Sequence, residues 1–170
     1  MKTETKKIHN NVVTSRPPVV AILGHIDHGK TTLLDYIRKS TVAEKEAGGI
    51  TQHVSAYEVL HKDASGKEKS ITFIDTPGHE AFASIRSRGA QIADVGILVV
   101  SGEDGVKPQT LEALKFVTDS KLPYIVAITK IDKPGANLER AKQSLLEKEI
   151  YVEGYGGSVP CVAVSSVSGE

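Results

Sequence analysis

The chain of 170 residues has very little cysteine. Cys161 is its only cysteine, so a disulfide within the chain is excluded and a reducing compartment fits best. Cys161 lies in the apolar run VPCVAVSS. At such a place we expect a buried structural thiol rather than a reactive one.

Long hydrophobic runs are also missing. The longest candidates, VVAIL, GILVV and IVAI, have the length of β-strands and fall far short of the ~20 residues that cross a bilayer. The first 16 residues are polar and lack the apolar centre of a signal peptide. These absences predict a cytoplasmic protein, with a flexible lead-in over 1–16 and one domain over 17–170.

Charge of one sign is not in excess, because 21 Lys and Arg residues balance 21 Asp and Glu residues. No overall basic field would therefore hold nucleic acid by charge alone. Any contact with RNA must come from a local patch or from a part of the protein outside this chain. The hydrophobic content of 39% and the length fit one soluble globular domain.

What the sequence does contain is a regular alternation of short apolar runs with amphipathic helical patterns. Continuous apolar runs rich in Val and Ile are typical of a mostly parallel sheet with helices on both faces. The polar turn at 62–69 predicts that the strands on either side of it form an antiparallel hairpin. The prediction is therefore a three-layer α/β fold with a six-stranded, mostly parallel sheet. The predicted strands cover 18–24, 54–61, 70–75, 95–101, 123–130 and 158–166, and the predicted helices cover 30–40, 79–91, 108–120 and 137–149.

Polar motifs follow the predicted strands. Sheets of this kind bind ligands at the carboxyl ends of their strands. GHIDHGKT follows the first strand, and DTPGH, EDG, TKID and SSVSG follow the third to the sixth. We therefore expect these motifs to meet at one edge of the sheet.

The stretch GHIDHGKT matches the phosphate-loop pattern G-x-x-x-x-G-K-[ST] between a strand and a helix. Gly24 and Gly29 let the backbone curl so that N–H groups face an anion, and the following helix adds its positive end. Lys30 would reach the outer phosphates, and the hydroxyl of Thr31 would bind magnesium. The predicted phosphate-binding residues are Gly24, His25, Ile26, Asp27, His28, Gly29, Lys30, Thr31 and Thr32.

A zinc site is the alternative for the same stretch, because it contains two histidines and an aspartate. It is less favoured, since Asp27 and His28 are adjacent, no cysteine is near, and distant ligands would have to enter a loop wrapped on phosphate. We accordingly expect the rings of His25 and His28 to be spectators, with their backbone mattering more.

The run ITFIDTPGH places Asp75 at the end of a strand, where its carboxylate would hold a magnesium-bound water. The amide of Gly78 could approach a terminal phosphate, because glycine permits close backbone contact. His79 would orient the attacking water; its alternative role is that of a polar residue in the first turn of a helix. A D-x-x-G pattern is weak by itself and takes its weight from following a phosphate loop.

The run EAGGITQH precedes the second predicted strand. Gly48 and Gly49 offer a hinge, and the hydroxyl of Thr51 could close on magnesium when three phosphates are bound. The alternative is a glycine turn that leads into the strand.

The run ITKID places Thr129, Lys130 and Asp132 after the fifth predicted strand. Asp132 could accept hydrogen bonds from N1–H and N2–H2 of guanine, whereas adenine would leave a buried carboxylate unpaired. The stem of Lys130 could lie along the base. The backbone amides of residues 165–167 would meet the guanine oxygen. Each pattern is frequent alone, and its weight comes from its place beside the phosphate loop.

On these motifs the chain resembles the translational GTPases and, more narrowly, the bacterial-type translation initiation factor 2 family. GHIDHGKT and DTPGH are shared across translational GTPases. The runs RPPVVAILGHIDHGKTTLLD, EAGGITQHVSAYEV and KIDKPGAN are more selective, and GGITQH in particular resembles the initiation factors. The resemblance covers about residues 16–170. It implies a Ras-like G domain that binds GTP or GDP with Mg²⁺.

The resemblance also implies a GTP hydrolase that works on the ribosome, with both subunits, during subunit joining. It makes His79 the water-positioning residue, activated by ribosomal RNA. It makes Asp27 a ligand of K⁺ or Na⁺, with a solvent-facing carboxylate as the alternative. Initiator tRNA would be bound by domains absent from this chain, which we expect to be a monomeric piece of a larger factor. A nucleotide-gated binding module and another translational GTPase, such as an elongation factor, are the alternative functions.

The sequence departs from the family pattern near the base. The family usually has asparagine where this chain has Thr129, and the loss of that amide should weaken nucleotide affinity while Asp132 keeps the preference for guanine. The usual Ser-Ala-Lys is Ser165-Ser166-Val167 here, which removes a lysine but leaves the backbone geometry available.

Overall fold

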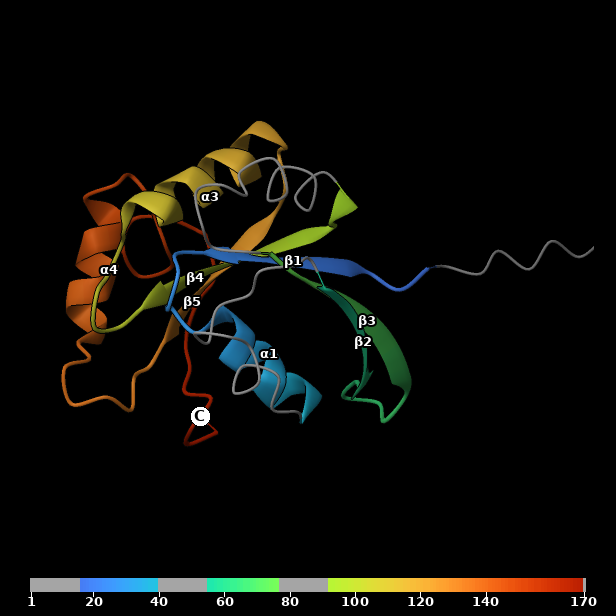
Figure 1. Ribbon diagram of the computed structural model, residues 1–170. Helices are drawn as coiled ribbons and strands as arrows, with labels where there is room; N and C mark the ends of the chain where they lie inside the picture. The colour runs from blue at the N-terminus through green and yellow to red at the C-terminus, as the bar shows by residue number, and fades with distance from the viewer. Residues whose placement is uncertain (1–15, 40–54, 77–91, 170) are drawn as a thin grey trace, which may run out of the picture.

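The computed structural model describes residues 16–39, 55–76 and 92–169. It contains one six-stranded sheet in the order β2-β3-β1-β4-β5-β6 (Figure 1). Strand β1 lies parallel to β3 and β4, β5 lies parallel to β4 and β6, and only β2 is antiparallel to its neighbour β3. The predicted mostly parallel sheet and hairpin are therefore confirmed. The strands are β1 Val19–Gly24, β2 Ser55–Lys62, β3 Glu68–Asp75, β4 Val95–Ser101, β5 Tyr124–Thr129 and β6 Cys161–Ala163, and the helices are α1 Lys30–Arg38, α3 Pro108–Asp119 and α4 Leu138–Leu146.

The three layers follow from the alternation of side chains along the strands. Helix α1 covers one face of the sheet, and α3 and α4 cover the other (Figure 1). Leu23 of β1 packs in the cluster under α3 and α4, whereas its neighbour Ile22 packs with Leu34 of α1. In β4, Val100 and Val99 divide between the two clusters in the same way. Because both faces of the central strands are buried, their sequences are continuously apolar.

The helix boundaries have local causes. Pro108 occupies the first turn of α3, where its missing N–H costs nothing. The side chain of Asn137 accepts a hydrogen bond of 2.9 Å from the N–H of Arg140, which confirms the predicted cap of α4. Helix α4 ends at Leu146 rather than at 149. The chain reverses there through Glu149, which has a φ of 61°, and this reversal buries Ile150.

The last strand is shorter than predicted. Strand β6 covers only Cys161–Ala163 of the expected 158–166. Pro160 has no N–H for the ladder, although its carbonyl accepts a hydrogen bond from Val126. Cys161 is half-buried rather than fully buried and packs beside the cluster under α3 and α4. Burial raises the pKa of its thiol, which fits a structural role.

The carboxyl ends of the strands line up as expected. In the pairing registers, Ile22 lies opposite Asp75, Gly24 opposite Val99, and Ser101 opposite Thr129. The motifs that follow β1, β3, β4 and β5 therefore start from one edge of the sheet. Among the described residues, no helix is long and apolar enough to cross a membrane.

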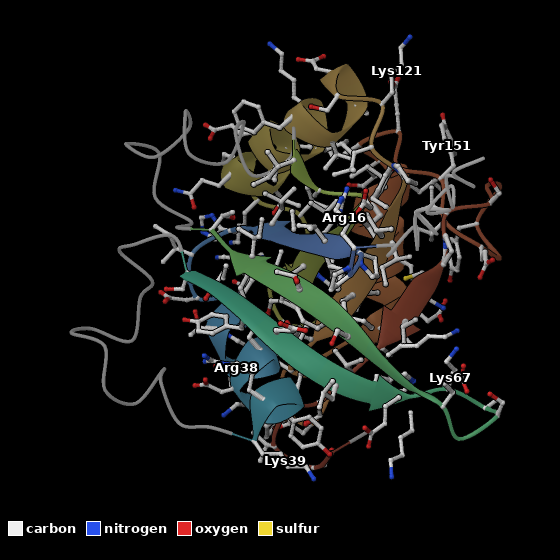
Figure 2. All side chains as sticks on the ribbon, turned by 90° about the vertical axis from the view of Figure 1, so that its right-hand side faces the viewer. Arg16, Arg38, Lys39, Lys67, Lys121 and Tyr151 are labelled. Atoms are coloured by element: carbon white, nitrogen blue, oxygen red, sulfur yellow. The ribbon has the colours of Figure 1, made fainter. Side chains whose placement is uncertain are left out.

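Arg16 stabilises the opposite end of the sheet, where strands β1 and β4 begin. Its side chain is labelled in Figure 2. Its guanidinium donates two hydrogen bonds of 2.7 Å to the carboxylate of Asp94, which also accepts one from the N–H of Val19. This pair ties the entry of β1 to the entry of β4. Residues 1–15 of the predicted lead-in, and the predicted helix at 79–91, lie outside the described residues.

Candidate functional site

The loop between β1 and α1 has a backbone that only certain residues can adopt. Gly24 has a φ of 147°, and a Cβ there would lie 2.5 Å from the carbonyl oxygen of Val99. Any side chain would therefore push β1 away from β4. Asp27 and Gly29 have φ values of 59° and 84°, in the left-handed region. The chain thus curls tightly and enters α1 with the first N–H groups of the helix at the bend.

Lys30 lies inside this bend. It is 6% exposed, and its ammonium donates a hydrogen bond of 2.6 Å to the carbonyl oxygen of His25. The side chain therefore lies back across the loop, with its charge held at the centre. A buried ammonium beside the first N–H groups of a helix fits an anion such as a polyphosphate.

Thr31 and Asp75 meet at the start of α1 and the end of β3. The hydroxyl of Thr31 lies 3.1 Å from Oδ2 of Asp75, and both side chains are buried. Thr76 fixes the chain that follows Asp75 by donating 2.7 Å to the carbonyl oxygen of Ile22. A hydroxyl and a carboxylate beside the loop form an all-oxygen donor set, which suits Mg²⁺.

A zinc site has no support in the described ranges. No group of three or more His, Cys, Asp or Glu side chains that could hold a metal occurs within them. The two loop histidines have other neighbours.

The ring of His28 is not a spectator, contrary to the expectation from the sequence. It is 1% exposed, and its Nδ1 accepts a hydrogen bond of 3.2 Å from the N–H of Ser101 at the end of β4. Burial lowers the pKa of His28 to about 4, so the ring is neutral at pH 7. Because Nδ1 accepts, Nε2 carries the proton, and Oδ2 of Asp104 lies 3.9 Å from it. The imidazole is a buried strut between the loop and β4.

The outer side of the loop rests on α3. The N–H of Ile26 donates 3.1 Å to the side-chain oxygen of Gln109. The ring of His25 meets that of His28 edge to face, with 4.9 Å between centroids, and burial is the main cause of its lowered pKa. Asp27 is exposed at the tip of the bend. Both of its sequence-based roles, as a cation ligand and as a solvent-facing carboxylate, stay predictions.

Thr129 joins the loop to β5. Its buried hydroxyl donates 2.6 Å to the carbonyl oxygen of His28 and lies 3.3 Å from that of Val100. The weaker nucleotide affinity expected from threonine at this position stays a prediction. In the structure the hydroxyl of Thr129 holds the residue directly before Gly29.

A cavity of about 230 Å³ adjoins this end of β5. Gly29 and Thr32 line it on the loop side, and Thr129, Asp132 and Val167 also contribute to its wall. Most of the residues that the sequence predicted for guanine thus line one hollow, together with Gly29 and Thr32 of the predicted phosphate loop. Lys130 lines it too, with a φ of 60°, and its ammonium is 3.9 Å from Oε2 of Glu103.

Asp132 is held differently from the prediction. Its carboxylate is exposed, so the argument from a buried unpaired charge does not apply to the chain by itself. The hydroxyl of Ser165 donates 2.6 Å to Oδ1 of Asp132, and this bond lowers the pKa of the carboxyl. The N–H groups of Val167 and Ser168 in turn donate to the hydroxyl of Ser165 at 3.2 and 3.1 Å. The amide of Val167, predicted to face guanine, is therefore engaged within its own turn.

Several predicted site residues cannot be placed. Thr51, Gly78 and His79 lie outside the described residues, so their roles stay predictions. Two contacts of the loop were not predicted from the sequence. Ser101 and Gln109 support the loop, and 73 and 83 residues separate them from their partners. Only the position of EDG after a strand pointed to this region.

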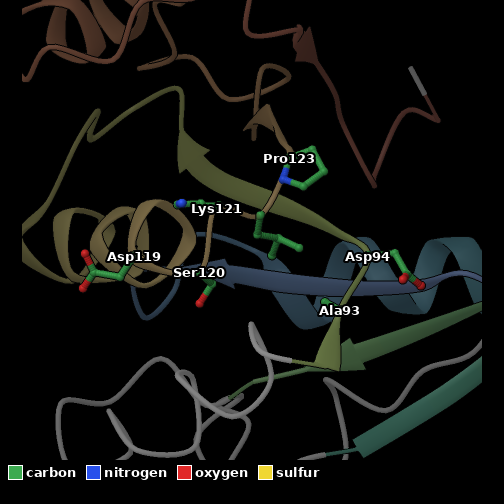
Figure 3. A pocket seen from close by; sticks show the side chains of 7 residues that line it. Ala93, Asp94, Asp119, Ser120, Lys121 and Pro123 are labelled. Carbon is green, nitrogen blue, oxygen red and sulfur yellow. The ribbon is translucent and has the colours of Figure 1, made fainter.

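A further cavity, of about 390 Å³, lies at the other end of the strands (Figure 3). Asp94, Ser120 and Pro123 line it, from the entry of β4 and the connection between α3 and β5. No residue of its wall belongs to the predicted site. The edge that carries the motifs is therefore the candidate functional site.

The chain matches a known protein family and several named relatives. Residues 15–170 match the family described as the elongation factor Tu GTP binding domain. The chain is 52% identical over 168 residues to a chloroplastic translation initiation factor IF-2 of Rhodomonas salina, covering 99% of this chain and 22% of that protein. It is 56% identical over 155 residues to translation initiation factor IF-2 of Alkaliphilus metalliredigens, covering 91% and 21%. The chain spans about a fifth of the length of these curated relatives.

Solved structures show the same fold. A bacterial selenocysteine-specific elongation factor, EF-Sec, superimposes with a TM-score of 0.71 at 28% identity, covering 91% of this chain and 26% of that one. Elongation factor SelB from Methanococcus maripaludis, in complex with the GTP analogue GppNHp, gives 0.67 at 28% identity, covering 90% and 30%.

Proposed function

Because this chain belongs to the elongation factor Tu GTP-binding-domain family of translational GTPases, we propose that it is the GTP-hydrolysing domain of a translation initiation factor. The factor would act on the ribosome while the subunits join. The relatives named translation initiation factor IF-2 support this choice over an elongation factor, because they are 52% and 56% identical to the chain, whereas the two elongation factors above are 28% identical. They extend well beyond it, and initiator tRNA would be bound by such further domains.

The single observation that carries the proposal is the grouping of Lys30, Thr31 and Asp75 at the curled loop. The ammonium of Lys30 lies within the bend, and the hydroxyl of Thr31 lies 3.1 Å from the carboxylate of Asp75. An ammonium beside the loop can bind the phosphates of a nucleoside triphosphate, and a hydroxyl and a carboxylate next to it can hold the divalent metal that accompanies them.

The residues act on the terminal phosphate in distinct ways. The N–H groups of the loop bind the phosphate oxygens, and Lys30 shifts from the carbonyl of His25 to the outer phosphates. Thr31 and Asp75 would hold Mg²⁺, which, when bound, supplies positive charge to the phosphate oxygens. His79 would orient the water that attacks the terminal phosphorus, and the bond to the leaving diphosphate breaks as the new P–O bond forms.

Base selection would come from Asp132. Its carboxylate accepts from N1–H and N2–H2 of guanine, and Ser165 holds one of its oxygens in place. A K⁺ or Na⁺ ion at Asp27 would add charge beside the phosphates. Turnover without the ribosome should be slow, on the order of 10⁻⁴ s⁻¹, as in small GTPases that lack an activator.

Calorimetric titration with GDP, GTP and ATP in the presence of Mg²⁺ tests the binding site. We expect GDP and GTP to bind and ATP to bind at least about 100-fold more weakly, because adenine lacks the donor pair for Asp132. Equal affinity for ATP would overturn the assignment of the base site.

Single-turnover GTP cleavage tests the reaction and the partner. The full-length protein should cleave GTP faster when ribosomes are added. The His79→Ala variant should keep its affinity for GDP and lose the stimulation. Absence of stimulation in the native full-length protein would leave a nucleotide-gated binding module and contradict the hydrolase.

A further inference from the structure

The hydroxyl of Thr129 has a single proton, and the structure shows where that proton goes. Its oxygen is 2.6 Å from the carbonyl oxygen of His28 and 3.3 Å from that of Val100. Both neighbours accept hydrogen bonds and neither can donate one. The proton is therefore committed to the protein, and the side chain has no donor left for a molecule in the adjoining cavity.

Thr129 lies at the phosphate-loop end of that cavity. A Cβ on Gly29 would be 3.8 Å from the hydroxyl oxygen of Thr129, and both residues line the same 230 Å³ hollow. Asp132 lines it as well, three residues farther along the chain. The hollow thus has the hydroxyl oxygen of Thr129 near the loop and the carboxylate of Asp132 farther along, with Lys130 and Lys133 also in its wall.

The orientation of a guanine nucleotide follows from these positions, and this step rests on the proposed function. N1–H and N2–H2 belong to the six-membered ring and face Asp132. N9 belongs to the five-membered ring and carries the ribose, which must lead to the phosphates at the loop. The five-membered ring, and with it N7, therefore lies toward Thr129.

N7 of guanine is an acceptor without a proton. Opposite Thr129 it meets a hydroxyl whose proton already serves His28, so no hydrogen bond forms between them. Lys130 does not replace it, because its ammonium lies 3.9 Å from the carboxylate of Glu103, toward the loop after β4. Thr129 therefore adds no hydrogen bond to N7, and the contact that reads the base comes from Asp132.

We propose that Thr129 makes this site indifferent to N7 of the purine, so that guanine nucleotides with a carbon in place of N7 bind as GDP and GTP do. The substrate class of the domain widens accordingly to 7-deazaguanine nucleotides. In such a molecule a C–H group replaces N7 with almost no change in shape, while the donor pair for Asp132 is kept.

The test is a competition titration of the native chain with GDP and 7-deaza-GDP in the presence of Mg²⁺. We expect the two dissociation constants to agree within about twofold, because no hydrogen bond is lost. A preference for GDP of fivefold or more would overturn the proposal, since it would require a donor that reads N7.

Two variants distinguish the cause. The Thr129→Asn variant brings two amide protons, one for the carbonyl of His28 and one for N7. We expect it to prefer GDP over 7-deaza-GDP by about three- to tenfold. The Thr129→Val variant keeps the shape and removes the hydroxyl, so both affinities should fall together while their ratio stays near one. A ratio far from one in the Thr129→Val variant would contradict the role of the hydroxyl.

Failure of the proposed function would look different. If the native chain bound neither GDP nor 7-deaza-GDP, the nucleotide site itself would be wrong, and the inference would fall with it. Binding of GDP with rejection of 7-deaza-GDP overturns the inference alone. The native ratio decides the matter even if a variant does not fold.

Discussion

The phosphate-loop end and the base end of the site are built in opposite ways. At the loop, His28, Lys30 and Thr31 are each under 9% exposed and are held from β3, β4, β5 and the loop itself. At the base end, Asp132 is exposed and Val167 is 78% exposed. Even the pKa shifts differ in origin, because burial lowers that of His28 and a hydrogen bond lowers that of Asp132.

This difference separates binding from selection. A loop whose backbone is already fixed loses little conformational freedom when an anion binds, so its interactions appear as affinity. In the proposed function, a purine would cover the exposed base end. Discrimination between bases would then depend on desolvation of Asp132 in the complex.

The largest expected effect is a change in base preference, which alters the base end alone. In the Asp132→Asn variant the donor and acceptor pattern inverts, and the preference should move from guanosine to xanthosine nucleotides. With two hydrogen bonds to a charged group exchanged, the affinity ratio should change by about 1,000-fold. Competition between GDP and XDP measures it. Unchanged selectivity would refute the assigned contact.

The next largest effect is a loss of nucleotide affinity caused by a change at the loop end. The Lys30→Ala variant removes the buried ammonium, and affinity for GDP and XDP alike should fall by about 100-fold or more, because the lost contact is to phosphate. Titration calorimetry checks this. A loss confined to one base would contradict the division between the two ends.

Folding of the loop end depends on close backbone packing. In the Gly24→Ala variant the new methyl group meets the carbonyl of Val99, and we expect unfolding to become easier by about 3 kcal/mol. Gly66 provides a matched control, because it also has a positive φ of 80° but nothing within 4 Å of its added Cβ. Gly66→Ala should cost only about 1 kcal/mol. Urea unfolding of both variants measures the difference, and equal losses would contradict the contact argument.

A smaller effect sharpens the role of the buried ring. The His28→Leu variant leaves the N–H of Ser101 without its acceptor, and GDP dissociation should speed up by about tenfold. The His28→Asn variant offers an oxygen in the place of Nδ1, so its dissociation rate should stay within about threefold of the native one. Stopped-flow displacement of a fluorescent GDP compares them. Equal rates in the two variants would show that the hydrogen bond to Ser101 does not matter.

The smallest effect concerns the pKa of Asp132. Its folded-state pKa lies below the ordinary value because of the hydroxyl of Ser165. The contact therefore contributes stability above the ordinary pKa, and this contribution is lost as the pH falls through the folded pKa. In the Ser165→Ala variant the pKa of Asp132 should rise toward its ordinary value. Carbon NMR titration of the carboxyl group follows it, and an unchanged midpoint would exclude the contact.

Most of the framework could be predicted from local patterns. Continuous apolar runs indicated parallel strands, the pattern of GHIDHGKT indicated the curled loop, and Asn137 marked the start of α4. The predictions were wrong for the ring of His28 and for the length of β6. The ring of His28 is held by Ser101, a residue distant along the chain, whereas β6 begins only after Pro160, which has no N–H for the ladder. The role of Asp132 at the base stays a prediction.

By itself, the sequence determined the order of strands and helices and the residues that follow each strand, because periodicity and glycine positions act over a few neighbouring residues. Only the tertiary structure decided which of those residues share a hydrogen bond. His28 meets Ser101 across 73 residues, and Ser165 meets Asp132 across 33. Such pairs form because the sheet brings the ends of separate strands to one edge, and no local pattern records that distance.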